Sequence, residues 1–363
     1  MYAWLHRLRG TRVVPPASAH DAVNSSLDAD VDKDDRTCDD VVGISWLRRN
    51  EATADFNRWL FGAQSASDIF VTPLEQRVLT ALEDIINGKQ SGVNLVRRMP
   101  GVIPQLLQSL RTDDFSGAEL ARKISNDVVL VAAVIRLANN AFYGTDKPIT
   151  SIEHAVLVLG QDGLRQLISG VAFKPIFNLK SGYYTQRIAP KCWRQAEMCA
   201  LAARVLAVDE PINPFEGFLA GLIQYVGLIV SLRVMDQITE GDTHLGSESF
   251  CNTLIDHARK LSCSIAREWQ FPSAVVTAIE EQGSKNQLVQ FSATGRILST
   301  ADFLGKVQVL SENGTPLADD GLVLSERAQA CLAVLAESSA AEAAAAAALA
   351  AAGAELADGR STQ

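Results

Sequence analysis

The 363-residue sequence is poor in the side chains that most often bind metal ions. It has five histidines, at positions 6, 20, 154, 244 and 257, and no two of them lie three or four residues apart. The six cysteines form no Cys-x-x-Cys pair and no spacing typical of a zinc site. Cysteines scattered in this way are typical of reduced, buried thiols. We therefore expect no histidine-rich or cysteine-rich metal site.

Signatures of export, membrane insertion and common enzyme classes are also missing. Residues 1–18 lack the apolar core of an export signal. The longest strongly apolar stretch, residues 217–232, is shorter than the roughly 20 residues that a membrane span needs. The sequence contains no P-loop, no dinucleotide-binding glycine turn and no G-x-S-x-G nucleophile elbow. These absences predict a soluble, cytoplasmic protein that contacts no membrane.

The charge is unevenly distributed. The chain has 33 Lys and Arg against 42 Asp and Glu, which gives a formal net charge of −9. Residues 21–40 hold eight Asp against Lys33 and Arg36, so six of those nine negative charges lie in one segment. A segment of this composition favours a disordered tail. The excess of acidic residues also argues against nucleic acid as a partner, because that role needs a concentrated basic surface.

Helix signals dominate from residue 44 onward. Thr72-Pro73-Leu74-Glu75 has an N-cap residue, a proline at the first helical position and a glutamate at the third, and similar starts occur at Ser116, Thr150 and Asn213. No period-two strand pattern and no Asn-Gly hairpin turn accompany them, so we predict an all-α fold. We divide the chain as follows: a disordered acidic tail (1–43), a helical extension (44–92), a central domain (93–285), C-terminal helices packed on its core (286–335) and an Ala-rich low-complexity tail (336–363).

Five motifs follow one another in the first part of the central domain. They are Met99-Pro-Gly-Val-Ile-Pro104, Ser116-Gly-Ala-Glu-Leu-Ala-Arg-Lys-Ile-Ser-Asn-Asp127, Arg136-Leu-Ala-Asn-Asn-Ala-Phe-Tyr-Gly144, Ile149-Thr-Ser-Ile-Glu-His-Ala-Val156 and Leu157-Val-Leu-Gly160. In this order they resemble the HDOD domain, a family associated with bacterial signalling and related to the HD metal-dependent phosphohydrolases. The resemblance covers residues from about 93 to 282. It implies an HD-superfamily-like multi-helix bundle with an N-terminal helical lobe.

The third motif has a physical interpretation of its own. Its polar and aromatic residues suit a corner between two helices, in which an Asn adopts the left-handed conformation of a C-cap and the aromatic rings pin the turn. We interpret it as a helix–turn–helix corner, and the alternative is a polar binding edge. The residues concerned are Arg136, Asn139, Asn140, Phe142, Tyr143 and Gly144.

The resemblance also indicates where a catalytic HD protein would hold its metal. Such relatives use a His on one helix, an adjacent His-Asp pair on a later helix and a further Asp. The matching segments, 193–197 and 218–227, carry Gln195 in place of the first His and Gln224-Tyr225 in place of the pair. A neutral amide is a weak ligand for catalytic metals, and a neutral phenol with a pKa near 10 does not replace a carboxylate. The segment Glu281-Gln282 stands where relatives often have paired His.

These replacements predict a protein without a metal or other cofactor and without hydrolase activity. We expect Gln195, Gln224 and Tyr225 to fill the former metal cavity with hydrogen bonds, and the alternative is a retained pocket for a small ligand. The function that we favour is a non-catalytic regulatory module that acts through a protein partner in a bacterial signalling pathway. Two alternatives remain: a sensor of a nucleotide second messenger, and a metal-dependent phosphohydrolase with unorthodox ligands.

Overall fold

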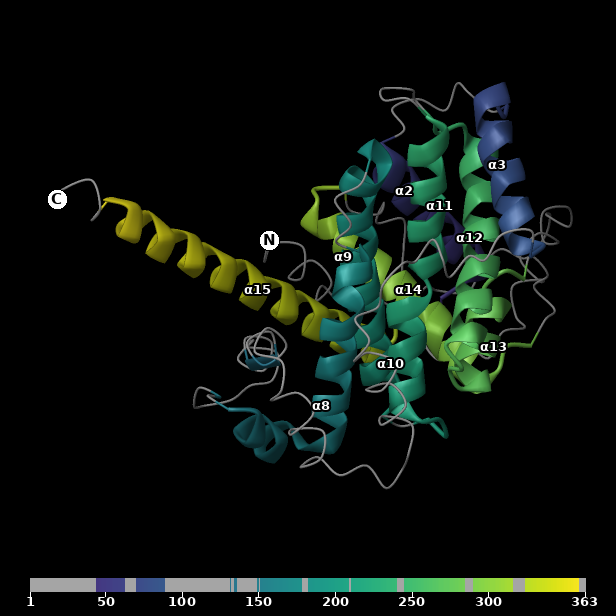
Figure 1. The fold of residues 1–363 in the computed structure, drawn as a ribbon. Helices are drawn as coiled ribbons and strands as arrows, with labels where there is room; N and C mark the ends of the chain where they lie inside the picture. Colours follow the sequence, from purple (N-terminus) through teal and green to yellow (C-terminus); the bar gives the residue numbers. More distant parts are fainter. Residues whose placement is uncertain are drawn as a thin grey trace, which may run out of the picture. The chain divides into compact units, whose positions relative to one another are not determined.

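The computed structural model describes residues 44–62, 70–88, 131, 134–135, 149, 151–177, 182–208, 210–239, 245–284, 290–315 and 324–358. The regular structure of these residues is α-helical throughout and includes no strand, which confirms the predicted all-α class (Figure 1). The chain divides into two compact units, residues 1–37 and 38–363, and every described residue belongs to the second.

The helices carry the labels of Figure 1. They are α2 (Trp46–Phe61), α3 (Pro73–Ile86), α8 (Ile152–Phe177), α9 (Tyr183–Leu206), α10 (Pro214–Ile223), α11 (Val226–Ile238), α12 (Glu248–Glu268), α13 (Ser273–Glu281), α14 (Ala293–Glu312) and α15 (Glu326–Asp358).

Two of the predicted helix starts are confirmed. At α3, Thr72 Oγ1 accepts a hydrogen bond from the Glu75 amide, and the Glu75 carboxylate accepts one from the Thr72 amide. At α10, the Asn213 side chain accepts from the amide of Phe215. The start of α8 lies one residue later than predicted, since the amide of His154 donates to Ser151 Oγ at 3.1 Å. Thr150 and the predicted start at Ser116 lie outside the described residues.

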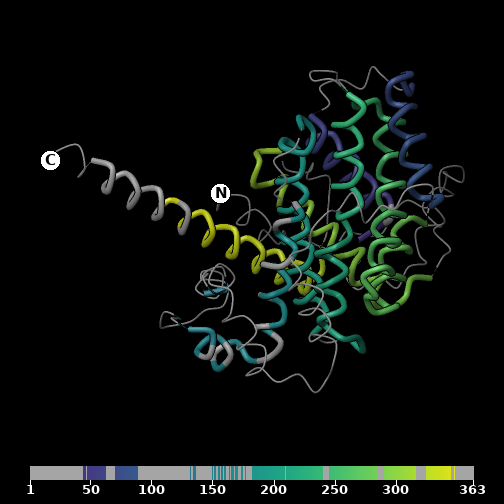
Figure 2. Tube along the Cα trace, in the orientation of Figure 1, coloured from purple at the N-terminus to yellow at the C-terminus, as the bar shows by residue number. Residues whose placement is uncertain are grey.

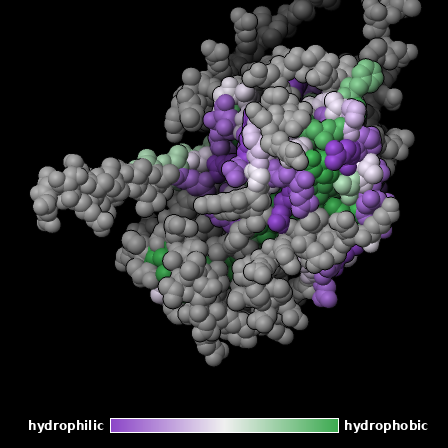
Figure 3. Space-filling model, turned by 45° about the horizontal axis from the view of Figure 1, so that its top comes forward, coloured by the Kyte–Doolittle hydropathy of each residue, from purple (hydrophilic) through white to green (hydrophobic). Residues whose placement is uncertain are grey.

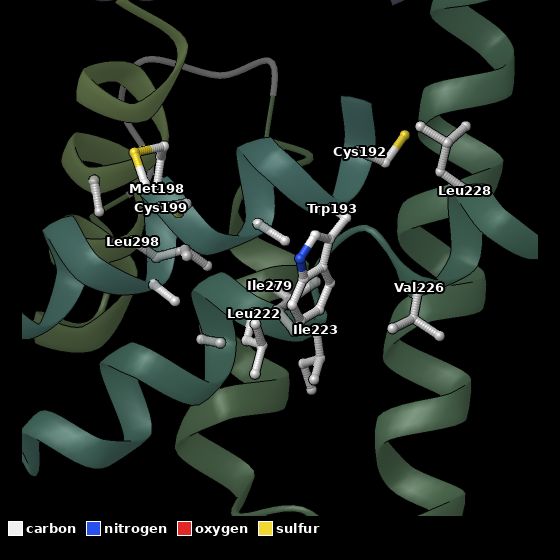
Figure 4. Packing of buried hydrophobic residues seen from close by; sticks show 14 of the residues in the cluster. Cys192, Trp193, Met198, Cys199, Leu222, Ile223, Val226, Leu228, Ile279 and Leu298 are labelled. Atoms are coloured by element: carbon white, nitrogen blue, oxygen red, sulfur yellow. The ribbon is translucent and has the colours of Figure 1, made fainter. Parts of the chain in front are cut away.

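Helix α9 lies at the centre of the bundle and packs against α10, α11 and α14, where large apolar side chains of these helices meet (Figure 4). The packing is close because small residues face one another. A Cβ atom at Gly221 of α10 would lie 2.7 Å from the backbone nitrogen of Ala200 on α9. At Gly227 of α11, a Cβ would overlap the carbonyl oxygen of Ala258 on α12. Glycine at both positions therefore permits the helices to come within contact distance of each other.

The apolar stretch noted in the sequence belongs to this core. Of the described residues, Pro214–Ile238 is the one helical segment long and apolar enough to cross a membrane, by length and composition. In the bundle, however, 78% of its most apolar window is buried. Burial of α10 and α11 among other helices accounts for the high hydropathy of this segment.

Helix α15 continues from the stretch after Ser325 into the Ala-rich sequence (Figure 2). Its first turns dock through apolar residues, of which Ala328, Cys331 and Leu335 are fully buried. Farther along, Glu342 pairs with Arg194 of α9 at 2.5 Å. Alanines at 343, 344 and 347 are exposed, so the docked part of α15 ends near this ion pair.

The described surface has a mixed character. The face drawn in Figure 3 carries hydrophilic and hydrophobic residues side by side. The large hydrophobic side chains that are exposed among the described residues come from separate elements: Leu47, Phe70, Leu157, Tyr183 and Val208. Scattered exposed apolar residues of this kind are normal for a folded surface.

Candidate functional site

The three positions singled out in the sequence, Gln195, Gln224 and Tyr225, lie together around one carboxylate, that of Asp302 on α14. Gln195 Nε2 of α9 donates to the Asp302 carbonyl oxygen at 3.0 Å and to Oδ1 at 3.1 Å. Gln224 Nε2 lies 3.3 Å from the same Oδ1. The Tyr225 hydroxyl donates to it at 2.9 Å. Side chains from two segments of the chain thus converge on a single acceptor in a third.

Local backbone geometry brings these side chains together. Gln224 and Tyr225 occupy the short break between α10 and α11, and both side chains reach Asp302 Oδ1 from this break. On α14, Gly305 follows Asp302 by nearly one helical turn. A Cβ at Gly305 would lie 3.1 Å from the Cys199 backbone nitrogen and 3.1 Å from Gln195 Nε2. The glycine therefore lets α9 approach α14 closely enough for Gln195 to reach Asp302.

A lysine ammonium completes the cluster. Lys306, one turn after Asp302 on α14, places Nζ 2.5 Å from Asp302 Oδ2. The lysine side chain is only 8% exposed and the aspartate side chain 18%. We call the set Gln195, Gln224, Tyr225, Asp302 and Lys306 the Asp302 centre. The single carboxylate of this centre is therefore already paired with the Lys306 ammonium.

Two titratable groups next to this ion pair, the phenol of Tyr225 and the thiol of the neighbouring Cys199, are held neutral. Burial raises the pKa of the Tyr225 phenol well above its ordinary value, and the negative charge of Asp302 raises it further. Burial and the charge of Asp302 likewise raise the pKa of the Cys199 thiol, whose sulfur lies 3.0 Å from Gln224 Nε2. Both groups therefore stay protonated at neutral pH. They act as hydrogen-bonding groups rather than as anionic ligands.

This donor set does not suit a divalent metal ion. It offers two amides, a neutral phenol, a neutral thiol and one carboxylate that faces an ammonium, whereas catalytic metals in proteins are held by imidazole, thiolate or several carboxylates. Among the residues that the structure describes, no group of three or more His, Cys, Asp and Glu side chains is placed to hold a metal. One acceptor at the centre remains open: the fully buried Gln195 has no hydrogen-bond partner at Oε1.

Glu281-Gln282, the segment that stands where relatives have paired histidines, makes hydrogen bonds at the junction of α13 and α14. Glu281 accepts from the Ser292 amide at 2.9 Å and from Ser292 Oγ at 2.8 Å. Gln282 Nε2 donates to the carbonyl oxygens of Ala278 and Gly295. These bonds join the end of α13 to the start of α14. The third sequence motif, with Arg136, Asn139, Asn140, Phe142, Tyr143 and Gly144, lies outside the described residues.

Sequence reasoning missed Asp302 and Lys306, although a signal for them exists. They stand four residues apart within a run of α14 that is otherwise almost entirely apolar, with Ala301, Phe303 and Leu304 around them. Charged residues are rarely buried unless they are paired. An Asp and a Lys at this helical spacing inside an apolar run therefore predict a buried ion pair.

Comparison with known proteins identifies the family. The model of the HDOD domain matches residues 96–284, which is more than half of the chain. The chain therefore belongs to the HDOD family, as its motifs predicted. Lys306, Asp302 and helix α2 lie outside the matched range, whereas Gln195, Gln224 and Tyr225 lie inside it.

Solved structures of low sequence identity share this helical fold. An HDOD domain protein of unknown function from Geobacter sulfurreducens has a TM-score of 0.50 at 20% identity, and the match covers 72% of this chain and 89% of that one. A candidate metal-dependent phosphohydrolase from Shewanella amazonensis SB2B has a TM-score of 0.51 at 16% identity, covering 74% and 99%. A candidate signal transduction protein from Marinobacter aquaeolei VT8 has a TM-score of 0.52 at 19% identity, covering 78% and 68%.

A curated relative is also similar in sequence. An uncharacterised protein of Treponema pallidum (strain Nichols) is 22% identical over 249 residues, which cover 66% of this chain. The matched region is 47% of that protein, so the chain spans about half the length of this relative.

Proposed function

We propose that this protein is a non-catalytic regulatory module that acts through a protein partner in a bacterial, cytoplasmic signalling pathway. The observation that carries the proposal is the Lys306 ammonium, 2.5 Å from Asp302 Oδ2 at the point where Gln195, Gln224 and Tyr225 converge. Membership of the HDOD family and the fold shared with a candidate signal transduction protein support the signalling role.

Electrostatics explain why the lysine matters. By our proposal Asp302 fills the place of the further Asp that catalytic HD proteins use, and it would be the one ligand that remains. A divalent cation at this carboxylate would have to displace the ammonium or lie within a few ångströms of it. Two like charges at such a distance repel strongly in a buried site. The ammonium thus supplies one positive charge without the Lewis acidity or bound water that hydrolysis requires.

The proposal is tested on the full chain, purified without chelators. We expect substoichiometric Mn, Fe, Zn and Mg by elemental analysis, and no hydrolysis of cyclic dinucleotides or nucleoside phosphates with any of these metals added. Gln224→Ala probes the centre, and Glu280→Gln is the matched control, because Glu280 lies in an exposed ion pair with Arg267 on the α12–α13 surface. Metal-dependent turnover that Gln224→Ala abolishes and Glu280→Gln leaves intact would establish the phosphohydrolase alternative instead.

A second candidate function is the binding of a nucleotide second messenger at the centre. The unpartnered, fully buried Oε1 of Gln195 favours it, because a ligand donor could satisfy this acceptor. Thermal-shift measurements with cyclic dinucleotides and nucleoside phosphates test it. A ligand present at 100 times its Kd stabilises the folded state by about 2.7 kcal/mol. A shift that Gln195→Ala removes would favour the sensor, and no shift with any of these ligands would favour the protein-partner function.

A further inference from the structure

Helix α2 lies directly against the Asp302 centre. It packs on α14 and α9. Ala52, Phe56 and Leu60 are spaced at four-residue intervals on one face of α2, and each is at most 1% exposed. The ring of Phe56 lies 6.4 Å from the ring of Tyr225, measured between centroids. The apolar face of α2 therefore covers a member of the centre.

The Lys306 ammonium contacts both the Asp302 carboxylate and helix α2. Besides its ion pair with Asp302, Nζ donates to Thr53 Oγ1 of α2 at 3.0 Å and lies 5.7 Å from the centroid of the Phe56 ring. Thr53 is fixed in turn, since its hydroxyl donates to the Arg49 carbonyl oxygen at 2.8 Å. One buried cation is thus shared by a carboxylate of α14 and by a hydroxyl and an aromatic face of α2.

Two further polar contacts hold α2 at its ends. Near the N-terminus, Arg49 donates to Ser299 Oγ at 2.7 Å and to Thr300 Oγ1 at 3.2 Å on α14. Near the C-terminus, Lys191 of α9 donates to the carbonyl oxygens of Trp59 and Leu60. A cation suits this end because the last carbonyls of a helix carry partial negative charge. All three polar attachments reach α14 or α9.

We propose that α2 and the Asp302 centre form a latch, in which the Asp302–Lys306 pair decides whether α2 stays docked on α14 and α9. A buried ammonium is stable only when its partners compensate for lost hydration. Breaking the ion pair removes the group that orients Nζ toward Thr53 and Phe56, and departure of α2 admits water to the pair. The two events are reciprocally linked. Release of α2 would uncover the faces of α9 and α14 that it covers.

The latch deepens the proposed function and rests on it, because it makes the centre a regulatory element. Hydrogen–deuterium exchange on the full chain tests it, with residues 46–61 followed separately from α3 and α12. In Asp302→Asn we expect the exchange of the α2 amides to accelerate at least about tenfold more than that of the α3 and α12 amides, which report any loss of global stability. Lys306→Met keeps much of the lysine stem and is expected to act in the same way, and it serves as the probe if the Asn variant does not fold.

The control is Glu280→Gln, which removes one charge at an exposed ion pair and is expected to leave α2 exchange unchanged. The proposal also predicts that substitutions of Asp302 and Thr53, the two partners of Lys306, have non-additive effects on the exchange rate of α2. Thr53→Val alone should accelerate α2 exchange, and Asp302→Asn with Thr53→Val should exchange no faster than the faster single variant.

Three results would overturn the latch: α2 exchange equal to that of the control, acceleration of α2 by the same factor as α3 and α12, or additive effects in the double variant. The same preparations are assayed for metal content and hydrolysis. Metal-dependent turnover would refute the proposed function whatever the exchange shows. Unchanged α2 exchange in metal-free, inactive protein would refute the latch alone.

Discussion

Two carboxylates of this bundle, those of Glu75 and Asp302, are each surrounded by donors, but the donors differ in kind. Glu75 is 1% exposed. It accepts from the backbone amides of Thr72, Gly246 and Ser247 and from Ser247 Oγ, all at 2.8–2.9 Å, and so joins the start of α3 to the start of α12. Asp302 accepts at its carboxylate from side chains, which include an ammonium.

The kind of donor determines whether the surroundings of a carboxylate can change by substitution. Burial alone would raise the pKa of Glu75, but hydrogen bonds from the amides of Thr72, Ser247 and Gly246 outweigh it and hold the pKa below its ordinary value. Backbone donors persist whatever the side chains around them become. The partners of Asp302 are side chains, so a single substitution can remove or replace a donor. The surroundings of Asp302 can therefore change by substitution, whereas most of those of Glu75 are set by the backbone.

The largest effect is expected from Asp302→Ala. The substitution leaves the Lys306 ammonium buried without its counterion, and it removes the Oδ1 acceptor of Gln195, Gln224 and Tyr225. Removal of one partner from a buried ion pair costs about 3–5 kcal/mol. Urea unfolding followed by circular dichroism at 222 nm measures the loss, with Glu280→Gln as the control, for which an exposed pair predicts less than about 1 kcal/mol.

Removal of both charges sharpens this prediction. In Asp302→Asn with Lys306→Met, no buried charge stays unpaired, so the double variant should be more stable than Asp302→Ala. A double variant that is as unstable as Asp302→Ala would mean that packing of the lysine stem and the hydrogen bonds to Oδ1, not the charge pair, determine the loss.

A smaller loss is expected from Glu75→Gln. The amide retains one acceptor oxygen but removes the charge that strengthens four hydrogen bonds at the junction of α3 and α12. Bonds to charged groups contribute about 1.5–3 kcal/mol each, so a destabilisation of about 2–3 kcal/mol near pH 7 is expected. Chemical unfolding at pH 7 measures it.

The pH dependence of the unfolding free energy tells whether Glu75 stabilises the fold through its charge or through its packing. Its pKa in the folded state is lowered from the ordinary value of 4.5, so its contribution is present above pH 4.5 and is lost as the pH falls through the folded-state pKa. The difference in unfolding free energy between wild type and Glu75→Gln should therefore shrink as the pH drops below 4.5. A difference that stays constant down to pH 3 would assign the effect to altered packing.

The helices could be predicted because their signals are local. Thr72, Pro73 and Glu75 specify the start of α3 within four residues, and the capping bonds observed there are those that the pattern implies. The long-range role of Glu75 could not be predicted in the same way. Its bonds to Gly246 and Ser247 join residues about 170 positions apart in sequence, and nothing local to either segment specifies that pairing.

The same limit applies to the Asp302 centre. Gln195, Gln224 and Tyr225 were found because a family motif marks their positions, and the structure places all three together. Asp302 and Lys306 lie beyond the matched range, at 293–312 in α14, and no motif marks them. The contact of Lys306 with Thr53 spans 253 positions and depends on how α2 docks, which periodicity alone does not determine.

The smallest effect is expected from Gly305→Ala, which tests how closely α9 must approach α14 for the centre to form. The new Cβ would lie 3.1 Å from Gln195 Nε2 and from the Cys199 amide nitrogen, so α9 or the amide of Gln195 must shift by a few tenths of an ångström. Overpacking costs about 1–3 kcal/mol and the change from Gly to Ala inside a helix gains about 1 kcal/mol, so we expect a net loss of about 1 kcal/mol. Gly246→Ala is the matched control, because nothing lies within 4 Å of a Cβ there. If thermal unfolding of the two variants gives the same midpoint, the spacing of α9 and α14 is not what positions Gln195 against Asp302.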